Sequence, residues 1–224
     1  MINFVSVCVD AYPILYAEKL HRQFQNVTDL KVMHWCITDR PEQLPSFIQP
    51  LAPFKKSKGW WNKINLFSPE MPKGDILYLD LDIVILQNFD QEILAMIENT
   101  SNISCVSDAI EWMGEKFNSS LMCFKSGSNA DIYKKFEKEE ATINNLAGGD
   151  QVWTGPLLKK IHYIDETFPN LKKNLKFQLA KNINNELKLP IEISDNIKLI
   201  DCTGHPKPHQ LKGLPYIRDN WHLV

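Results

Sequence analysis

Net charge is nearly absent from this sequence of 224 residues, since 25 Lys and Arg residues stand against 27 Asp and Glu residues, for a formal value of −2. Proteins that bind nucleic acids or anionic membranes through their overall charge usually carry a clear basic excess. Long apolar runs are also lacking, because no stretch reaches the roughly 18 uninterrupted apolar residues of a membrane-spanning helix. The sequence therefore predicts neither a nucleic-acid partner nor an integral membrane segment.

A secretory leader and a disulfide framework are lacking as well. The first residues, MINFVSVCVDAYP, have no basic lead and reach Asp10 too early for a signal peptide. The cysteines are odd in number, scattered, and mostly inside apolar runs: Cys8, Cys36, Cys105, Cys123 and Cys202. This distribution predicts buried free thiols in a reducing compartment, not disulfides or a zinc site. We therefore expect a cytoplasmic protein.

The sequence does contain enough apolar residues, 44% of the total, to form one buried hydrophobic core. Residues 3–9 and 30–37 are β-rich apolar runs, and residues 12–24 between them have helical spacing. Strand, helix and strand in this order form a βαβ unit, which predicts an α/β fold with parallel strands. Later segments predict helices at 59–67, 90–98 and 129–146, and the glycines of GGDQ, residues 148–151, predict the opening of another helix. Strands are predicted at 76–86, 102–107, 119–127 and near 196–202, and mixed strand and loop at 170–198.

Two carboxylates interrupt the apolar run ILYLDLDIVIL, residues 76–86. Alternate side chains of a strand share a face, so Asp80 and Asp82 would stand side by side between apolar neighbours. Asp is disfavoured in strands, and buried like charges repel each other. A divalent cation would remove both problems, because carboxylates are hard oxygen ligands suited to Mn²⁺ or Mg²⁺. The pair is therefore a candidate metal site.

Two other interpretations of this pair stay open. The strand face could be solvated, with both aspartates as ordinary surface residues. The pair could also belong to an aspartyl-phosphate phosphatase of the haloacid-dehalogenase type, where an apolar strand ends in D-x-D followed by Thr or Val, as Val84 does here. That chemistry needs a later acidic pair, for which the sequence offers no convincing candidate. The motif of that class also usually opens the domain, whereas about 75 residues precede this one.

A series of short segments follows in a fixed order: VCVDAYPILYA, CITD, WWNKINLF, LYLDLDIVI, FNSSLMCFKSG, GGDQ and CTGHPKPH. Together they resemble the nucleotide-sugar-dependent glycosyltransferases of the GT-A fold, most closely family 8 and its small bacterial and viral relatives. The resemblance covers nearly the whole chain. It implies one GT-A domain over residues 1–224, with a Rossmann-like mixed central sheet flanked by helices. The nucleotide-binding half would lie at about 1–100 and the donor-sugar and acceptor half at about 101–224.

The resemblance also implies a role for each matching residue. Nucleotide and phosphate contacts would come from Asp10, Tyr12, Asp39, Lys63, Leu81, Gly204 and Lys207. The metal ligands would be Asp80, Asp82 and Asp201, with His205 as the alternate to Asp201. The donor sugar or acceptor would contact Asn118, Ser119 and Ser120. Asp150 and Gln151 would be catalytic, with Gln151 near the anomeric carbon and the configuration there retained.

Two positions depart from the family pattern. A histidine usually stands just before the glycine of the closing loop as the third metal ligand, but here Asp201 and Thr203 occupy the candidate positions before Gly204. A glycine is common where Ser120 stands. These departures motivate one further alternative, a catalytically inactive GT-A module that binds a nucleotide or sugar.

The chemistry explains why these residue types would be needed. Transfer of a sugar from a nucleoside diphosphate leaves negative charge on the diphosphate, which a bound metal stabilises as a Lewis acid. Lys63 and Lys207 would add cationic donors, and Pro206 and Pro208 would fix the loop that carries Lys207. We therefore expect a Mn²⁺- or Mg²⁺-dependent transferase that uses a nucleotide-sugar donor, UDP-sugar above others, with an acceptor that the sequence does not identify.

Several of these residues also have simpler explanations. Asp150 could cap a helix, Lys63 could be a solvated helix residue, and Tyr12 could belong to the core. Three tryptophans are candidates for an acceptor-stacking surface, although core packing is the more frequent role: Trp60, Trp61 and Trp112.

Overall fold

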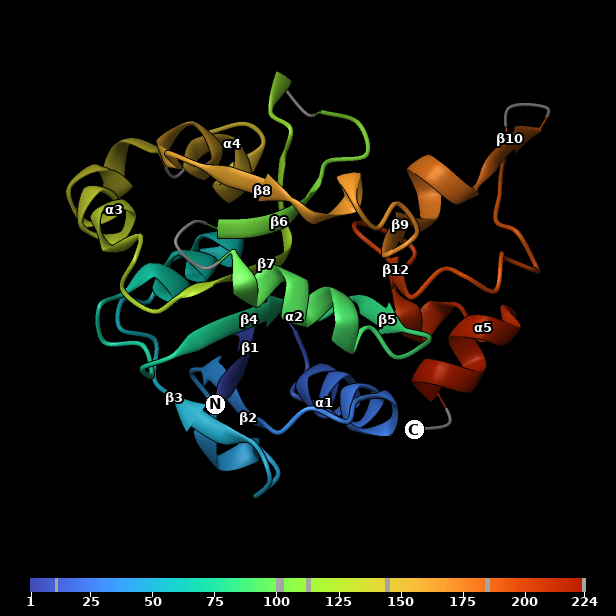
Figure 1. Ribbon diagram of the computed structural model, residues 1–224, viewed down its shortest axis with the longest axis horizontal. Helices are drawn as coiled ribbons and strands as arrows, with labels where there is room; N and C mark the ends of the chain where they lie inside the picture. The colour runs from blue at the N-terminus through green and yellow to red at the C-terminus, as the bar shows by residue number, and fades with distance from the viewer. Residues whose placement is uncertain (11, 100–102, 112–113, 144–145, 184–185, 223–224) are drawn as a thin grey trace.

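The computed structural model describes the whole chain except residues 11, 100–102, 112–113, 144–145, 184–185 and 223–224 (Figure 1). Its described residues form a central seven-stranded sheet in the order β3-β2-β1-β4-β7-β6-β8. The strands are β1 (Ile2–Cys8), β2 (Val32–Thr38), β3 (Gln49–Leu51), β4 (Asp75–Leu79), β6 (Ile103–Ser107), β7 (Phe117–Lys125) and β8 (Ile161–Tyr163). Strands β3, β2, β1 and β4 are parallel, whereas β7 is antiparallel to both of its neighbours. The predicted mixed α/β sheet and the parallel βαβ unit are confirmed.

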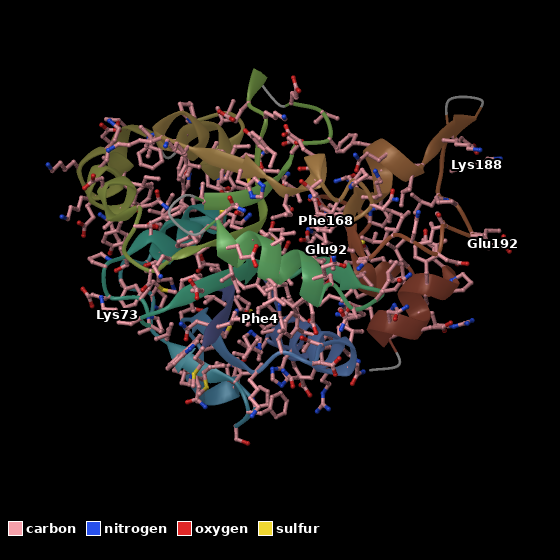
Figure 2. All side chains as sticks on the ribbon, in the orientation of Figure 1. Phe4, Lys73, Glu92, Phe168, Lys188 and Glu192 are labelled. Atoms are coloured by element: carbon pink, nitrogen blue, oxygen red, sulfur yellow. The ribbon has the colours of Figure 1, made fainter. Side chains whose placement is uncertain are left out.

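The sheet is buried on both faces, because alternate residues of its strands enter two different apolar clusters. Phe4 of β1 and Leu77 of β4 lie in one cluster, together with residues of α1 (Leu15–Val27) and α2 (Asp90–Glu98). Val5 and Ile76 lie in the other cluster, with residues of α3 (Ala130–Ile143) and of the 3₁₀ helix η2 (Gly59–Phe67). Phe4 points into the interior in Figure 2, whereas Lys188 and Glu192 point outward at the periphery.

A second, three-stranded sheet lies beside the first, in the order β5-β12-β9. Its strands are β5 (Ile83–Ile85), β12 (Leu199–Asp201) and β9 (Lys172–Asn174), with β12 antiparallel to β5 and parallel to β9. The strand predicted over 76–86 is therefore wrong as one continuous element. It ends at Leu79, turns, and resumes at Ile83 in a different sheet.

Shorter elements complete the chain. They are α4 (Gly149–Thr154), α5 (Pro215–Ile217), the antiparallel pair β10 (Lys181–Ile183) and β11 (Glu186–Lys188), and the helical turns η1 (Pro41–Gln43), η4 (Gly155–Leu157), η5 (Ile164–Glu166), η6 (Leu175–Leu179), η7 (Pro208–Gln210) and η8 (Arg218–His222). The helix predicted to open at residues 148–151 is confirmed as α4, which ends at Thr154, and the segment continues through η4 to the start of β8. All five cysteines are buried. In the part of the chain that the structure describes, no helix is both long enough and apolar enough to cross a bilayer.

Several strand ends and starts meet at one edge of the sheet and position the site. Strands β1 and β4 end there, and β7 begins there because it runs antiparallel to β4, with Leu79 opposite Leu121. The loop that follows β12 joins them, since the Cys202 amide donates to the Asp82 carbonyl at 3.1 Å. Polar residues at carboxyl ends of parallel strands are the usual ligand-binding groups of α/β proteins.

Candidate active site

A cleft of about 790 Å³ opens at this edge of the sheet. It is lined by most of the predicted site residues: Tyr12, Lys63, Asp80, Leu81, Asp82, Asn118, Ser119, Ser120, Asp150, Gln151, Gly204 and Lys207. Four predicted residues do not line it: Asp10, Asp39, Asp201 and His205. The fold therefore gathers into one cavity residues that lie as far apart in the sequence as Tyr12 and Lys207.

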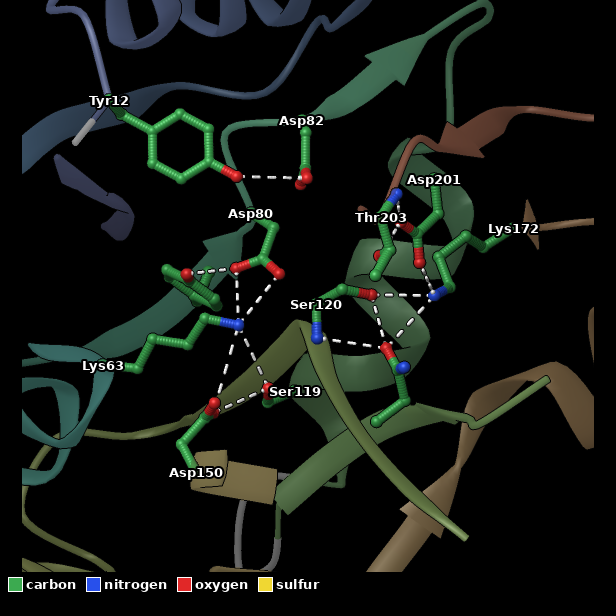
Figure 3. Close-up of polar contacts among 12 residues, drawn as sticks. Tyr12, Lys63, Asp80, Asp82, Ser119, Ser120, Asp150, Lys172, Asp201 and Thr203 are labelled. Carbon is green, nitrogen blue, oxygen red and sulfur yellow. Dashed lines mark hydrogen bonds and ion pairs between the residues drawn. The ribbon is translucent and has the colours of Figure 1, made fainter. Parts of the chain in front are cut away.

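The first aspartate of the pair is held in the turn between β4 and β5. The Asp80 amide donates to the Ser120 carbonyl at 2.8 Å, and the Ile83 amide donates to the Asp80 carbonyl at 3.2 Å. The carboxylate accepts from the Tyr78 hydroxyl, and its two oxygens lie 2.8 and 2.9 Å from Lys63 Nζ. Asp80 thus faces the cleft with a fixed backbone and a cationic partner (Figure 3).

Lys63 connects this aspartate to a second acidic residue. Its Nζ lies 3.1 Å from Ser119 Oγ and 4.0 Å from Asp150 Oδ2, and the Ser119 hydroxyl donates to Asp150 at 2.9 Å. Burial alone would lower the pKa of Lys63, but the charges of Asp150 and Asp80 raise it above its usual value. Lys63 is therefore an ammonium group at neutral pH. The alternative of a solvated helix lysine is wrong, because only 17% of this side chain is exposed.

The second aspartate of the pair belongs to a separate cluster. Asp82 is 4% exposed, accepts from the Tyr12 hydroxyl at 3.2 Å, and is in contact with Lys207 Nζ. Lys207 also donates to the Tyr12 hydroxyl at 2.8 Å. Burial and the charge of Asp80 raise the pKa of Asp82, and Lys207 opposes that shift. The Tyr12 hydroxyl, the Asp82 carboxylate and the Lys207 ammonium thus form one polar group on the cleft wall.

The residues present fit a divalent cation. Asp80 and Asp82 both line the cleft from one short turn, and carboxylate oxygens are preferred ligands of Mn²⁺ and Mg²⁺. Each carboxylate has an ammonium group as its partner, and a bound cation would replace that partner at the carboxylate oxygens. Among the described residues, no group of three or more His, Cys, Asp or Glu is arranged to hold a metal. A cation here would therefore take further ligands from substrate oxygens and water, as Mg²⁺ commonly does.

Asp201, the expected third metal ligand, has another partner. Its carboxylate lies 2.8 Å from Lys172 Nζ and accepts from the Thr203 amide at 2.9 Å and from the Thr203 hydroxyl. Burial would raise the pKa of Asp201, but Lys172 and Thr203 hold it below its usual value. The same Lys172 ammonium lies 2.7 Å from Ser120 Oγ and 3.1 Å from Asn118 Oδ1. His205, the alternate ligand, is exposed and lies outside the cleft lining.

The sequence gives little indication of Lys172. It lies in the Lys- and Asn-rich tract that was predicted only as mixed strand and loop, and its neighbour Lys173 looks equivalent in the sequence. The strand β9 separates the two, because alternate residues point to opposite faces. Lys172 is buried and Lys173 is half-buried.

The predicted catalytic residues lie in the first turn of α4. Asp150 does not cap this helix, because the residue at the N-cap is Gly148, so that alternative is wrong. The Gln151 side chain donates a hydrogen bond from its amide nitrogen Nε2 to the Asp108 carboxylate. A carboxylate only accepts, so the amide nitrogen must face Asp108 and the carbonyl oxygen Oε1 stays available to a ligand. Asp108 lines the cleft and was missed, although it directly follows the strand predicted over 102–107.

The tryptophans have different roles. Trp60 is 59% exposed and lines the cleft, and its ring lies so close to Gly149 that a Cβ there would be 2.5 Å from Trp60 Nε1. Trp61 is buried and stacks on Phe136 in the core. Trp112 lies outside the described residues. Of the described candidates for an acceptor-stacking surface, Trp60 remains.

Two predicted nucleotide contacts lie outside the cleft lining, after the ends of β1 and β2. Lys56 Nζ lies 2.7 Å from an Asp39 oxygen and 3.5 Å from Asp10. The Arg40 guanidinium donates to the Tyr12 carbonyl at 2.7 Å. The nucleotide role of Asp10 and Asp39 stays a prediction.

Comparison with known proteins gives no family-model match and no match among curated proteins. Solved structures do match. The galactosyltransferase LgtC, in complex with donor and acceptor sugar analogs, has a TM-score of 0.69 and 14% identity, over 99% of this chain and 94% of LgtC. The glycosyltransferase GlyE of Streptococcus pneumoniae TIGR4 has a TM-score of 0.65 and 14% identity, over 100% of this chain and 62% of GlyE. This chain therefore has the GT-A fold seen in these two glycosyltransferases.

Proposed function

We propose that this protein is a metal-dependent glycosyltransferase that moves a sugar from a nucleoside-diphosphate sugar, with a UDP-sugar as the expected donor, to an acceptor. The observation that carries the proposal is the convergence of Asp80, Asp82, Lys63 and Lys207 on one cleft of a GT-A fold. The LgtC complex supports it, because the same fold holds donor and acceptor sugar analogs there.

The diphosphate of the donor would lie between Lys63 and Lys207. Asp80 and Asp82 would hold Mn²⁺ or Mg²⁺, which supplies Lewis-acid stabilisation of the diphosphate when bound. The nucleoside would lie toward Tyr12 and Leu81, near Asp10 and Asp39. Asp201 lies outside the cleft lining and is paired with Lys172, so we assign it the role of counter-ion to Lys172 in place of the role of metal ligand.

The donor sugar would lie against the start of β7 and the start of α4. Asn118, Ser119 and Ser120 present polar groups from β7, and Asp150 and Gln151 present theirs from α4. Gln151 would direct its Oε1 at the anomeric carbon, with retention of configuration. A structure of an LgtC active-site mutant in which glutamine is replaced by glutamate supports a glutamine as an active-site residue of this fold.

The alternatives have less support. The GT-A fold gives no support to a phosphatase of the haloacid-dehalogenase type. An inactive binding module remains as a second candidate, because Asp201 is engaged with Lys172. Hydrolysis or transfer of a donor sugar above background, lost in Asp82→Ala, would exclude that module.

Thermal unfolding tests the main proposal. A ligand at about 100 times its Kd stabilises a folded protein by about 2.7 kcal/mol, which is about 5–11 °C in Tm for a chain of this size. We expect UDP with Mn²⁺ to raise the Tm by this amount and Asp82→Asn to remove the effect. Asp131→Asn, at an exposed position of helix α3, is the matched control and should keep the effect. Absence of stabilisation by UDP, GDP, ADP and CDP with Mn²⁺ or Mg²⁺ would contradict the proposal.

A further inference from the structure

The lysines around the cleft differ in whether a carboxylate neutralises them. Three form ion pairs: Lys63 with Asp80, Lys207 with Asp82, and Lys172 with Asp201. Lys176 lines the same cleft, yet within the described ranges no carboxylate forms an ion pair with its ammonium group. It is thus a cation of the cleft whose charge is not already shared with an aspartate.

The Lys176 ammonium lies over the loop that carries Lys207. A Cβ built on Gly204 would lie 2.5 Å from Lys176 Nζ, so the ammonium occupies the space that a side chain at this position would fill. Gly204 has a φ of +75°, a conformation that favours glycine. The backbone and the lack of a side chain at Gly204 therefore allow Lys176 to approach this loop closely.

The backbone of Lys176 is held in place by its own helical turn. The Asn174 side chain accepts from the Lys176 amide at 3.0 Å and from the Phe177 amide at 3.1 Å, which caps η6. Asn174 is itself buried and lines the cleft. The ammonium group thus extends from a fixed backbone toward the Gly204 loop.

A diphosphate leaving group is stabilised best by a cationic side chain that is not already in an ion pair with an aspartate of the site. The charges of Lys63 and Lys207 are offset by Asp80 and Asp82 in the absence of ligand. We propose that Lys176 binds the β-phosphate of the nucleoside diphosphate, next to Gly204 and Lys207. This inference rests on the proposed function and adds a residue that the sequence analysis did not assign.

The charge change on transfer explains why this contact would matter. The bond between the anomeric carbon and the β-phosphate oxygen breaks, and its electron pair stays on that oxygen. The acceptor hydroxyl oxygen bonds to the anomeric carbon, and its proton is released to solvent. The diphosphate gains one negative charge, which the Lys176 ammonium stabilises at the oxygen where it develops.

Calorimetric titration of uridine, UMP and UDP with Mn²⁺ tests the contact. One charge-assisted hydrogen bond corresponds to about a 10- to 100-fold change in Kd. We expect Lys176→Met to weaken the binding of UDP by this factor and the binding of UMP by about threefold or less. The binding of uridine should not change. Lys176→Arg should keep UDP affinity within about threefold, and Lys176→Glu should weaken it more than Lys176→Met does. Lys173→Met is the control, because this residue lies outside the cleft lining, and it should leave all three affinities unchanged.

The outcomes separate this inference from the proposed function. If the parent protein binds UDP and Lys176→Met binds it with the same affinity, the role of Lys176 is overturned and the glycosyltransferase proposal stays intact. Equal losses for UMP and UDP would also overturn it, because Lys176 would then act on the α-phosphate. Failure of the parent protein to bind UDP, GDP, ADP or CDP would overturn both. Circular dichroism of each variant confirms that the compared proteins are folded.

Discussion

Lys172 and Asp201 form an ion pair in which 6% and 1% of the two side chains are exposed. The same ammonium also contacts the Ser120 hydroxyl. Ser120 and Asp201 both stand where the sequence departs from the family 8 pattern, and Lys172 contacts both of them. The departures are therefore connected in space, and together they form the polar environment of a buried lysine.

Replacing Lys172 should be strongly destabilising. Lys172→Met would leave the Asp201 carboxylate buried without its partner, and breaking a buried pair in this way costs about 3–5 kcal/mol. Urea unfolding at pH 7.5 measures the loss. The double variant with Asp201→Leu should recover most of the stability, because it removes the unpaired charge as well.

The neighbouring lysine is the matched control for this prediction. Lys173→Met should change the free energy of unfolding by about 0.5 kcal/mol or less, because the residue makes no buried ion pair. Similar losses in the Lys172 and Lys173 variants would show that the buried pair contributes nothing specific.

Asp108 should decide how Gln151 is oriented. Gln151→Glu would place a carboxylate against the Asp108 carboxylate in place of the present hydrogen bond, and we expect a loss of about 1 kcal/mol in stability. Asp108→Asn in the same protein supplies an amide donor to the new carboxylate and should restore the stability. A double variant as unstable as Gln151→Glu alone would contradict this pairing. The transfer activities of Gln151→Glu and of the double variant then distinguish the effect of losing the hydrogen bond from the effect of losing the Gln151 amide.

His34 should make the stability depend on pH. It is buried, lies 2.9 Å from Ser6 Oγ and 3.0 Å from His21 Nδ1, and burial followed by the charge of His21 lowers its pKa well below the usual value. The unfolded chain binds a proton near pH 6.5, whereas folded His34 stays neutral. Its contribution to stability is therefore complete above about pH 6.5 and is lost as the pH falls below it.

Urea unfolding at pH 7.5, 6.5 and 5.5 measures this dependence. The free energy of unfolding should fall by about 1 kcal/mol between pH 6.5 and 5.5 on account of His34. His34→Gln should remove this part of the slope, whereas His205→Gln, a change at an exposed histidine, should keep it. An unchanged slope in His34→Gln would show that this residue is not responsible.

Local patterns in the sequence predict the first βαβ unit correctly, because the apolar spacing within each of β1, α1 and β2 marks the faces that pack into the core. The strand predicted over 76–86 extends too far for a related reason. Ile83–Ile85 is as apolar as the end of β4, but it is buried in the second sheet, so the apolar run continues across the break. The turn itself depends on the carbonyl of Ser120, which no local pattern reveals.

Most of the predicted site residues lie in one cleft, because their segments follow strands that end at one edge of the sheet. Lys172 could not be predicted in this way. Its burial is created by β7 and β12, which supply Ser120 and Asp201 from distant parts of the chain. The predicted roles of the individual residues, the division into two halves and the cytoplasmic location stay predictions.

The contact of Lys207 with Tyr12 and Asp82 spans nearly the whole length of the polypeptide. During synthesis, the first half of the chain can form its βαβ unit while the cleft still lacks this wall. A bound nucleotide would contact residues of both sheets. Nucleotide binding could therefore serve as an assay of late folding steps, since it would begin only after the closing loop has joined the rest of the molecule.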